Sequence, residues 1–207
     1  MKKLLLSFLF AASVSAAFSQ TVSFGIKVGL NLSELTHANQ ADYGSALLTG
    51  FNAGGIVDIG FANFSIQPGI FYSTKGEKDT KEFTDLNQHY YPSKFELDYV
   101  EIPVNFLYKA KFSPAITLDF GGGPYIGYGV SETLKVSYPP SIITNDYSNY
   151  HHYGYPNPDY GINFLAGFTL KGNWLIDAGY SIGLRNLPSP EAAHNRVLSL
   201  SVGYLLK

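Results

Sequence analysis

The side chains of this sequence that could carry out chemistry are its histidines, serines and acids, but their spacing forms no recognised centre. The histidines are His37, His89, His151, His152 and His194, and the chain contains no cysteine. The adjacent pair His151 and His152 could ligate a metal, although neighbouring positions seldom converge on one ion without a third ligand. Neither a Gly-x-Ser-x-Gly elbow nor a strand-borne His–Ser–acid set is found. The residues therefore predict no catalytic, metal or cofactor site.

The run around the histidine pair is instead a candidate binding surface. It is rich in tyrosine and consists of Tyr147, Tyr150, His151, His152, Tyr153 and Tyr155. Tyrosine supplies a large amphipathic contact area at a low conformational cost, which favours recognition over catalysis. The glycine-rich run 121–127 is not a phosphate-binding loop, because it lacks Gly-Lys-Ser/Thr and lies within a predicted strand with no helix after it.

The composition favours an all-β protein and excludes some partners. The net charge is −2 and charged residues make up 14 %, without the basic stripe that a nucleic acid partner requires. Aromatic residues reach 15 % and there are 21 glycines, a combination that favours closely packed strands over helices. Without cysteine there are no disulfides and no thiolate metal sites.

Apolar and polar residues alternate along most of the chain, and this period of two predicts strands. In the first strand, Val22, Phe24, Ile26, Val28, Leu30 and Leu32 share one face. The pattern recurs often enough to predict eight antiparallel strands, an even number that suits closure into a barrel. Their ranges are 22–32, 49–60, 64–75, 95–109, 115–130, 159–171, 174–185 and 195–207.

The two faces of these strands distinguish a membrane barrel from a soluble, lipocalin-like barrel. The apolar face carries the bulky residues, whereas the other face is dominated by Gly, Ser and Asn. A narrow eight-stranded interior favours small and polar residues, while lipid accepts a bulky apolar exterior. We therefore predict an eight-stranded antiparallel transmembrane β-barrel of the outer-membrane type, with lipid and lipopolysaccharide around it.

The lengths of the predicted connections alternate, which predicts an orientation. Links 33–48, 76–94, 131–158 and 186–194 are long, whereas links 61–63, 110–114 and 171–173 are short. Outer-membrane barrels have long extracellular loops and short periplasmic turns, so both termini should be periplasmic. Aromatic residues should form two girdles at the membrane interfaces. The lower girdle is Phe24, Phe61, Phe64, Tyr108, Phe112, Phe168, Trp174 and Tyr204, and the upper one is Tyr72, Tyr99, Tyr128 and Tyr160.

The first residues predict export. Lys2 and Lys3 precede an apolar run from Leu4 to about Ala17, followed by small residues, which is the pattern of a secretory signal peptide. Cleavage before Gln20 fits best, and cleavage after Ala17 fits nearly as well. We expect residues 1–19 to be the signal peptide and residues 20–207 to form one barrel domain in the bacterial outer membrane.

Several segments resemble a known family. They are GIKVGLN at 25–31, LDYVEIPV at 97–104, DFGGGPY at 119–125 and LSVGY at 200–204. They resemble the small outer-membrane β-barrel proteins of the porin-family or PorT-like type. The resemblance implies the fold and the location more than an activity. PorT-type members are associated with a protein-secretion and gliding apparatus.

Charged residues on the inward face form a predicted polar core, which is made of Lys27, Asp58, Glu101, Asp119, Asp177 and Arg185. Charges in so narrow a space must be paired or hydrated. We expect Glu101 and Arg185 to bridge across the interior and the core to be closed to ions. The alternative is a proton or ion path, which nothing in the spacing supports. Pro68, Pro103 and Pro124 fall inside predicted strands and suggest bulges, and a change of apolar phase predicts another bulge near Tyr99.

Three functional hypotheses follow. The first is a non-enzymatic, structural or loop-presenting barrel whose extracellular loops bind other envelope proteins, surface glycans or lipopolysaccharide. The second, from the resemblance, is a component of a secretion or transport apparatus. The third is a hydrolase at the barrel rim, which requires loop histidines to converge in space.

Overall fold

The computed structural model describes residues 20–37, 45–84, 90–137, 142–147, 158–185 and 193–206. The expected signal peptide and all of the tyrosine-rich run except Tyr147 lie outside these ranges. No helix in the described ranges is long and apolar enough to cross a membrane.

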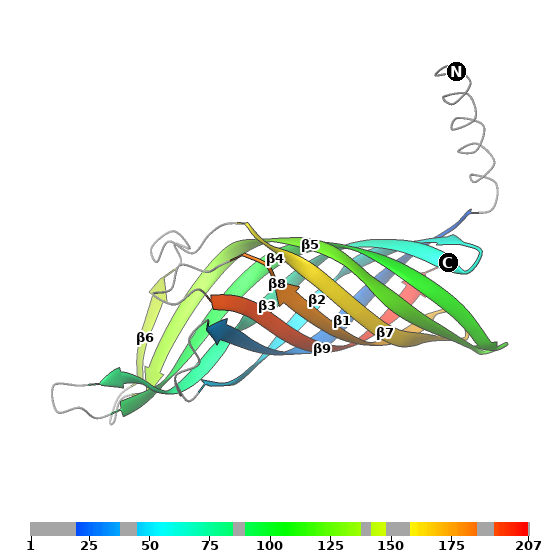
Figure 1. Cartoon of the computed structure of the whole chain (residues 1–207). Coiled ribbons are helices and arrows are strands. Elements are labelled where there is room, and N and C mark those ends of the chain that lie inside the picture. The colour runs from blue at the N-terminus through cyan, green and yellow to red at the C-terminus, as the bar shows by residue number, and fades with distance from the viewer. Residues whose placement is uncertain are drawn as a thin grey trace, which may run out of the picture.

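The described strands form one antiparallel sheet that closes on itself (Figure 1). They are β1 (Gln20–His37), β2 (Ser45–Phe61), β3 (Phe64–Thr84), β4 (Tyr90–Ser113), β5 (Ile116–Ser137), β6 (Ile142–Tyr147), β7 (Asp159–Leu170), β8 (Trp174–Gly183) and β9 (Ala193–Leu206). The order β4-β3-β2-β1-β9-β8-β7-β5 is closed by pairing of β4 with β5, which gives the predicted eight-stranded barrel. The beginning of β1 and the C-terminus lie at the same end of it (Figure 1).

The strands on one side of the barrel continue well beyond it. Residues 77–84 of β3, 90–98 of β4 and 131–137 of β5, together with β6, form an extension that we call the projecting sheet (Figure 1). The predicted long links 76–94 and 131–158 were therefore wrong in part, because strands occupy much of both. The sequence also predicted loops for His37 and His194, but these residues lie in β1 and β9.

The three prolines within the barrel strands do not cause bulges. Pro68 pairs with Val104 in the register that also pairs Phe71 with Glu101, so the β3–β4 ladder is unshifted. The ladders on either side of Pro103 and Pro124 also keep one register. A register shift does occur beside Tyr99, because Asp98 pairs with Ser131 and Tyr99 with Gly129. The extra residue, Val130, lies in β5, so the change of phase predicted for the fourth strand is wrong.

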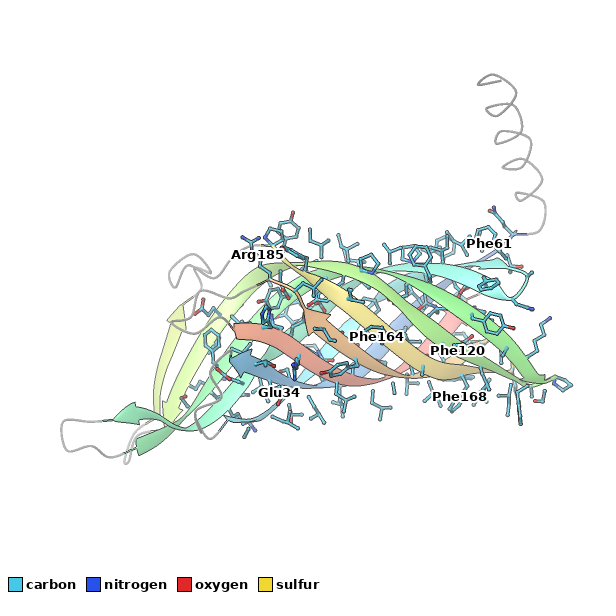
Figure 2. The ribbon with its side chains drawn as sticks, in the orientation of Figure 1. Glu34, Phe61, Phe120, Phe164, Phe168 and Arg185 are labelled. Carbon is cyan, nitrogen blue, oxygen red and sulfur yellow. The ribbon has the colours of Figure 1, made fainter. Side chains whose placement is uncertain are left out.

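Apolar side chains cover the outside of the barrel. Phe24, Ile26 and Leu30 of β1 are each about 60 % exposed, and Phe120 and Phe164 lie on the outer surface of β5 and β7 (Figure 2). Aromatic rings pack against one another across strands near the turns, as in the pair Trp174 and Tyr204, whose ring centroids are 5.0 Å apart.

One predicted member of the upper girdle points the other way. Tyr99 is fully buried, with 0 % of its surface exposed. The odd-numbered residues of β4 face the lumen along the whole barrel, including Leu97, Tyr99 and Leu107, so the Tyr99 ring points inward. The apolar outer band therefore includes Tyr72, Tyr128 and Tyr160 at its upper edge, but not Tyr99.

Candidate functional site

The barrel interior brings together ionisable side chains from seven strands. Of the six residues predicted to face inward, Lys27, Asp58, Asp119 and Asp177 are buried, and Glu101 and Arg185 are half-buried. Period-two alternation places the five that lie in strands, because each strand of a closed barrel directs every second side chain into the lumen. Arg185 follows the end of β8 at Gly183.

The charges near the short turns form two ion pairs. Lys27 of β1 pairs with Asp177 of β8. Lys109 of β4 lies 2.6 Å from Asp58 of β2, and Gln67 donates to the same Asp58 oxygen at 3.1 Å. The two ion pairs link strands that are not neighbours in the barrel, β1 with β8 and β4 with β2, so they cross the lumen.

A second cluster nearer the projecting sheet is centred on Lys75 of β3, whose side chain is 1 % exposed. Its ammonium pairs with Glu101 and lies 3.4 Å from Asp159. It also lies over the rings of Tyr99 and Tyr125, at 5.1 Å and 4.4 Å from their centroids. Each contact favours a cation at this position.

The expected bridge between Glu101 and Arg185 is wrong. Glu101 pairs with Lys75, whereas the Arg185 guanidinium donates to the carbonyl oxygen of Pro158 at 3.0 Å. Lys75 was absent from the predicted polar core because the third strand was predicted to end at this residue. The alternation could have identified it, because Lys75 lies an even number of residues from Gln67, Phe71 and Ser73 and therefore on the same inward face of β3.

Asp159 is the other carboxylate of the Lys75 cluster, and it was also absent from the predicted polar core. One of its carboxylate oxygens accepts from the Tyr125 hydroxyl at 3.3 Å and from the Asn195 amide at 3.2 Å, in addition to Lys75. Asp159 is the first residue of β7, and a residue at the start of a strand has few neighbours on its own strand from which its face could be predicted.

Between the two clusters lies a polar layer around a small cavity. Asn31 donates to Ser73 Oγ and to the Thr74 carbonyl, both at 3.1 Å, and its own side-chain oxygen accepts from Asn52 at 2.7 Å. The cavity has a volume of about 100 Å³, and its wall includes both Lys27 and Lys75.

The other residues singled out in the sequence, the tyrosine-rich run and the histidines, are not part of the charged clusters described above. Residues 150–155 of the tyrosine-rich run lie outside the described ranges, and Tyr147 ends β6, where its backbone pairs with Glu132. His194 of β9 has a buried Nδ1 without a hydrogen-bond partner among the described residues. Within the described ranges, no three His, Cys, Asp or Glu side chains are grouped so that they could hold a metal ion.

A closed barrel with an apolar exterior and a charged interior is typical of outer-membrane proteins. The sequence comparison agrees, because residues 18–188 match the model of the outer membrane protein beta-barrel domain family. The chain belongs to this family. It is therefore an outer-membrane β-barrel protein, and the membership places it in the bacterial outer membrane.

Solved structures of other small barrels are similar to this outer-membrane barrel. Neisserial surface protein A is 13 % identical, with 89 % of this chain and 98 % of that chain covered and a TM-score of 0.48. Ail of Yersinia pestis, in complex with the heparin analogue sucrose octasulfate, is 15 % identical, with 89 % and 99 % covered and a TM-score of 0.43. OprG of Pseudomonas aeruginosa is 12 % identical, with 90 % and 97 % covered and a TM-score of 0.34. No curated protein matches the chain.

Proposed function

We propose that this outer-membrane barrel is a non-enzymatic surface protein that presents its projecting sheet, and the tyrosine-rich run, for binding outside the cell. The observation that carries this proposal is the length of the strands. A barrel strand needs roughly 9–11 residues to cross a membrane, yet β3, β4 and β5 have 21, 24 and 22 residues. The excess forms ordered structure beyond the apolar band on one side of the barrel (Figure 1).

The orientation in this proposal places the projecting sheet outside the cell. The short turns at Ala62, Ala115 and Gly172 lie at the other end, which resembles the periplasmic end of outer-membrane barrels. Export by a signal peptide at residues 1–19 and periplasmic termini belong to the same proposal. The partners that suit a tyrosine-rich, mixed-charge surface are surface glycans, lipopolysaccharide head groups or other envelope proteins.

The test compares the full chain with two trimmed variants in phosphatidylcholine vesicles. One variant replaces residues 78–94 by a two-residue turn, because Lys78 and Lys94 are paired and the shortened hairpin can close there. The other lacks residues 148–157. Vesicles carrying each protein are applied to a glycan array and to lipopolysaccharide-coated surfaces, and heat-modifiable migration reports whether the barrel is folded.

We expect the full chain to bind at least one of these surfaces and a folded trimmed variant to lose at least tenfold in affinity. Equal binding by the full chain and both trimmed barrels would contradict a role for the projecting sheet. Absence of binding by every form would leave the barrel with a structural role in the envelope.

A further inference from the structure

Five buried side-chain oxygens of the barrel interior lack a hydrogen-bond partner among the residues that the structure describes. They are Ser65 Oγ, Asp119 Oδ1, Asn105 Oδ1, Asp159 Oδ1 and Asn195 Oδ1. Each of these residues is at most 7 % exposed. A buried acceptor without a donor costs about 1–3 kcal/mol, so each of these atoms requires water or a cation.

These acceptors occur at successive positions along one lumen. Asp119 lies near the short turns, three residues after β5 begins, whereas Asp159 and Asn195 lie near the opposite end. Asn105 lies between them, in the wall of the 100 Å³ cavity. That volume exceeds the roughly 30 Å³ that one water occupies in the liquid, so several waters fit.

The charges of the lumen favour cations. The carboxylates are Asp58, Glu101, Asp119, Asp159 and Asp177, and the lysines are Lys27, Lys75 and Lys109. Arg185, at the outer end with its guanidinium on the Pro158 carbonyl, still leaves the carboxylates in excess. The apolar cluster of Ile56, Leu175 and Leu205 with Phe71 occupies one side of the lumen, so an ion must pass along the other side. The excess carboxylates and the amide oxygens on that side attract cations and repel anions.

Two lysines occupy this path, one on each side of the cavity. Lys75 is held by Glu101, Asp159 and the rings of Tyr99 and Tyr125. Lys27 is held by Asp177, and both lysines contribute to the cavity wall. Each ammonium thus occupies a position whose surroundings favour a monovalent cation.

We propose that the lumen is a path for monovalent cations which the tethered ammonium groups of Lys27 and Lys75 hold shut. Either lysine alone keeps the path closed, because each occupies it on a different side of the cavity. The wild-type barrel is then a closed pore, and its conduction depends on displacing both side chains. This inference does not depend on the proposed binding function.

The experiment measures currents through purified, folded full-length protein in planar bilayers across a tenfold KCl gradient. We expect wild type, Lys27→Ala and Lys75→Ala to stay closed. The double variant Lys27→Ala/Lys75→Ala should conduct at least tenfold more, with a reversal potential that shows preference for K⁺ over Cl⁻. The matched control is Lys94→Ala/Lys135→Ala, which removes two lysines whose side chains are 34 % and 44 % exposed on the projecting sheet.

A second substitution tests the path itself. Adding Asn105→Leu and Ser199→Leu to the double variant fills the cavity wall and should abolish the new current. A folded double variant that stays closed, a preference for Cl⁻, a single variant that conducts as well as the double one, or current that survives the leucines would each overturn the proposal.

Folding is checked by heat-modifiable migration before each recording. If the alanine pair does not fold, Lys27→Gln/Lys75→Gln carries the same test, because glutamine keeps a donor for each carboxylate without the charge. Failure of both pairs to fold would assign the lysines a purely structural role and overturn the proposal.

Discussion

At the scale of single residues, Lys75 makes it possible for two carboxylates to lie deep in a membrane barrel. Glu101 and Asp159 both contact its ammonium. Removal of one partner of a buried pair costs about 3–5 kcal/mol, because the remaining charge stays in a poorly solvated place. The cluster therefore couples β3, β4 and β7, and a lost lysine should weaken the barrel as well as alter its lumen.

Glu132 of β5 shows the opposite situation, since it is buried without a partner. It lies in the projecting sheet, beyond the apolar band, with 0 % exposure, and neither carboxylate oxygen has a hydrogen-bond partner among the described residues. Burial raises the pKa of this carboxyl from 4.5 to about 7. A raised acid pKa means that folding is opposed once the group ionises, so stability falls as the pH rises from about 4.5 through 7.

We therefore predict that the projecting sheet is more stable at pH 5 than at pH 8. Glu132→Gln should remove this difference, because it should stabilise the sheet at pH 8 by about 1–3 kcal/mol. Hydrogen exchange of residues 129–136, corrected for the intrinsic pH dependence of exchange, measures it. Glu96→Gln is the control. Burial alone would raise the pKa of Glu96, but Lys94 and Lys135 hold it below the usual value, so its replacement should not stabilise the sheet at pH 8. Equal protection of wild type at the two pH values would contradict the prediction.

At the scale of the strand, the glycine run of β5 allows close approach to β4. A Cβ at Gly123 would overlap the carbonyl oxygen of Val104, whereas a Cβ at Gly55 of β2 would meet only the Gly25 carbonyl oxygen at 3.8 Å. The first contact requires the β4 backbone to move, and the second is an ordinary van der Waals distance.

Gly123→Ala should therefore lower the free energy of unfolding by about 1–3 kcal/mol, while Gly55→Ala should change it by less than about 0.5 kcal/mol. Urea unfolding of the barrel in lipid vesicles, followed by the fluorescence of Trp174, measures both. Similar stabilities for the two variants would show that β4 and β5 have room to separate at Gly123.

The alternation of residues made the barrel strands predictable, because lipid on one side and a narrow lumen on the other impose a strict period of two. That contrast ends where the strands leave the apolar band. Residues 77–84 and 90–96 form strands, but their sequence does not alternate apolar and polar residues regularly, so it predicted a loop. The alternation also predicted which charged residues face the lumen, but it did not predict their ion-pair partners. Both Glu101 and Arg185 were expected to face inward. Which cation lies closest to Glu101 depends on the register between strands, and that register brings Lys75 to it.

At the scale of the whole molecule, closure explains how a barrel with a polar interior is stable in lipid. Every barrel strand pairs on both sides, so the apolar band has no unpaired backbone edge. The projecting sheet is different, because β6 ends the sheet order and, among the described strands, pairs only with β5. Edges of this kind are tolerated in water but not in hydrocarbon, which places the projecting sheet outside the bilayer.

The orientation of the barrel in the membrane can be tested at two residues. We expect Asp146, in β6 of the projecting sheet, to face the outside of the cell and Ser113, at the β4–β5 turn, to face the periplasm. The chain has no cysteine, so Asp146→Cys and Ser113→Cys each introduce a single thiol. A membrane-impermeant maleimide applied to intact cells should label the first variant strongly and the second only after the outer membrane is permeabilised.

Detergent-solubilised protein, in which both thiols should react, controls for local accessibility. Labelling of Ser113→Cys but not Asp146→Cys on intact cells would reverse the orientation, and with it the proposal that the projecting sheet binds partners at the cell surface.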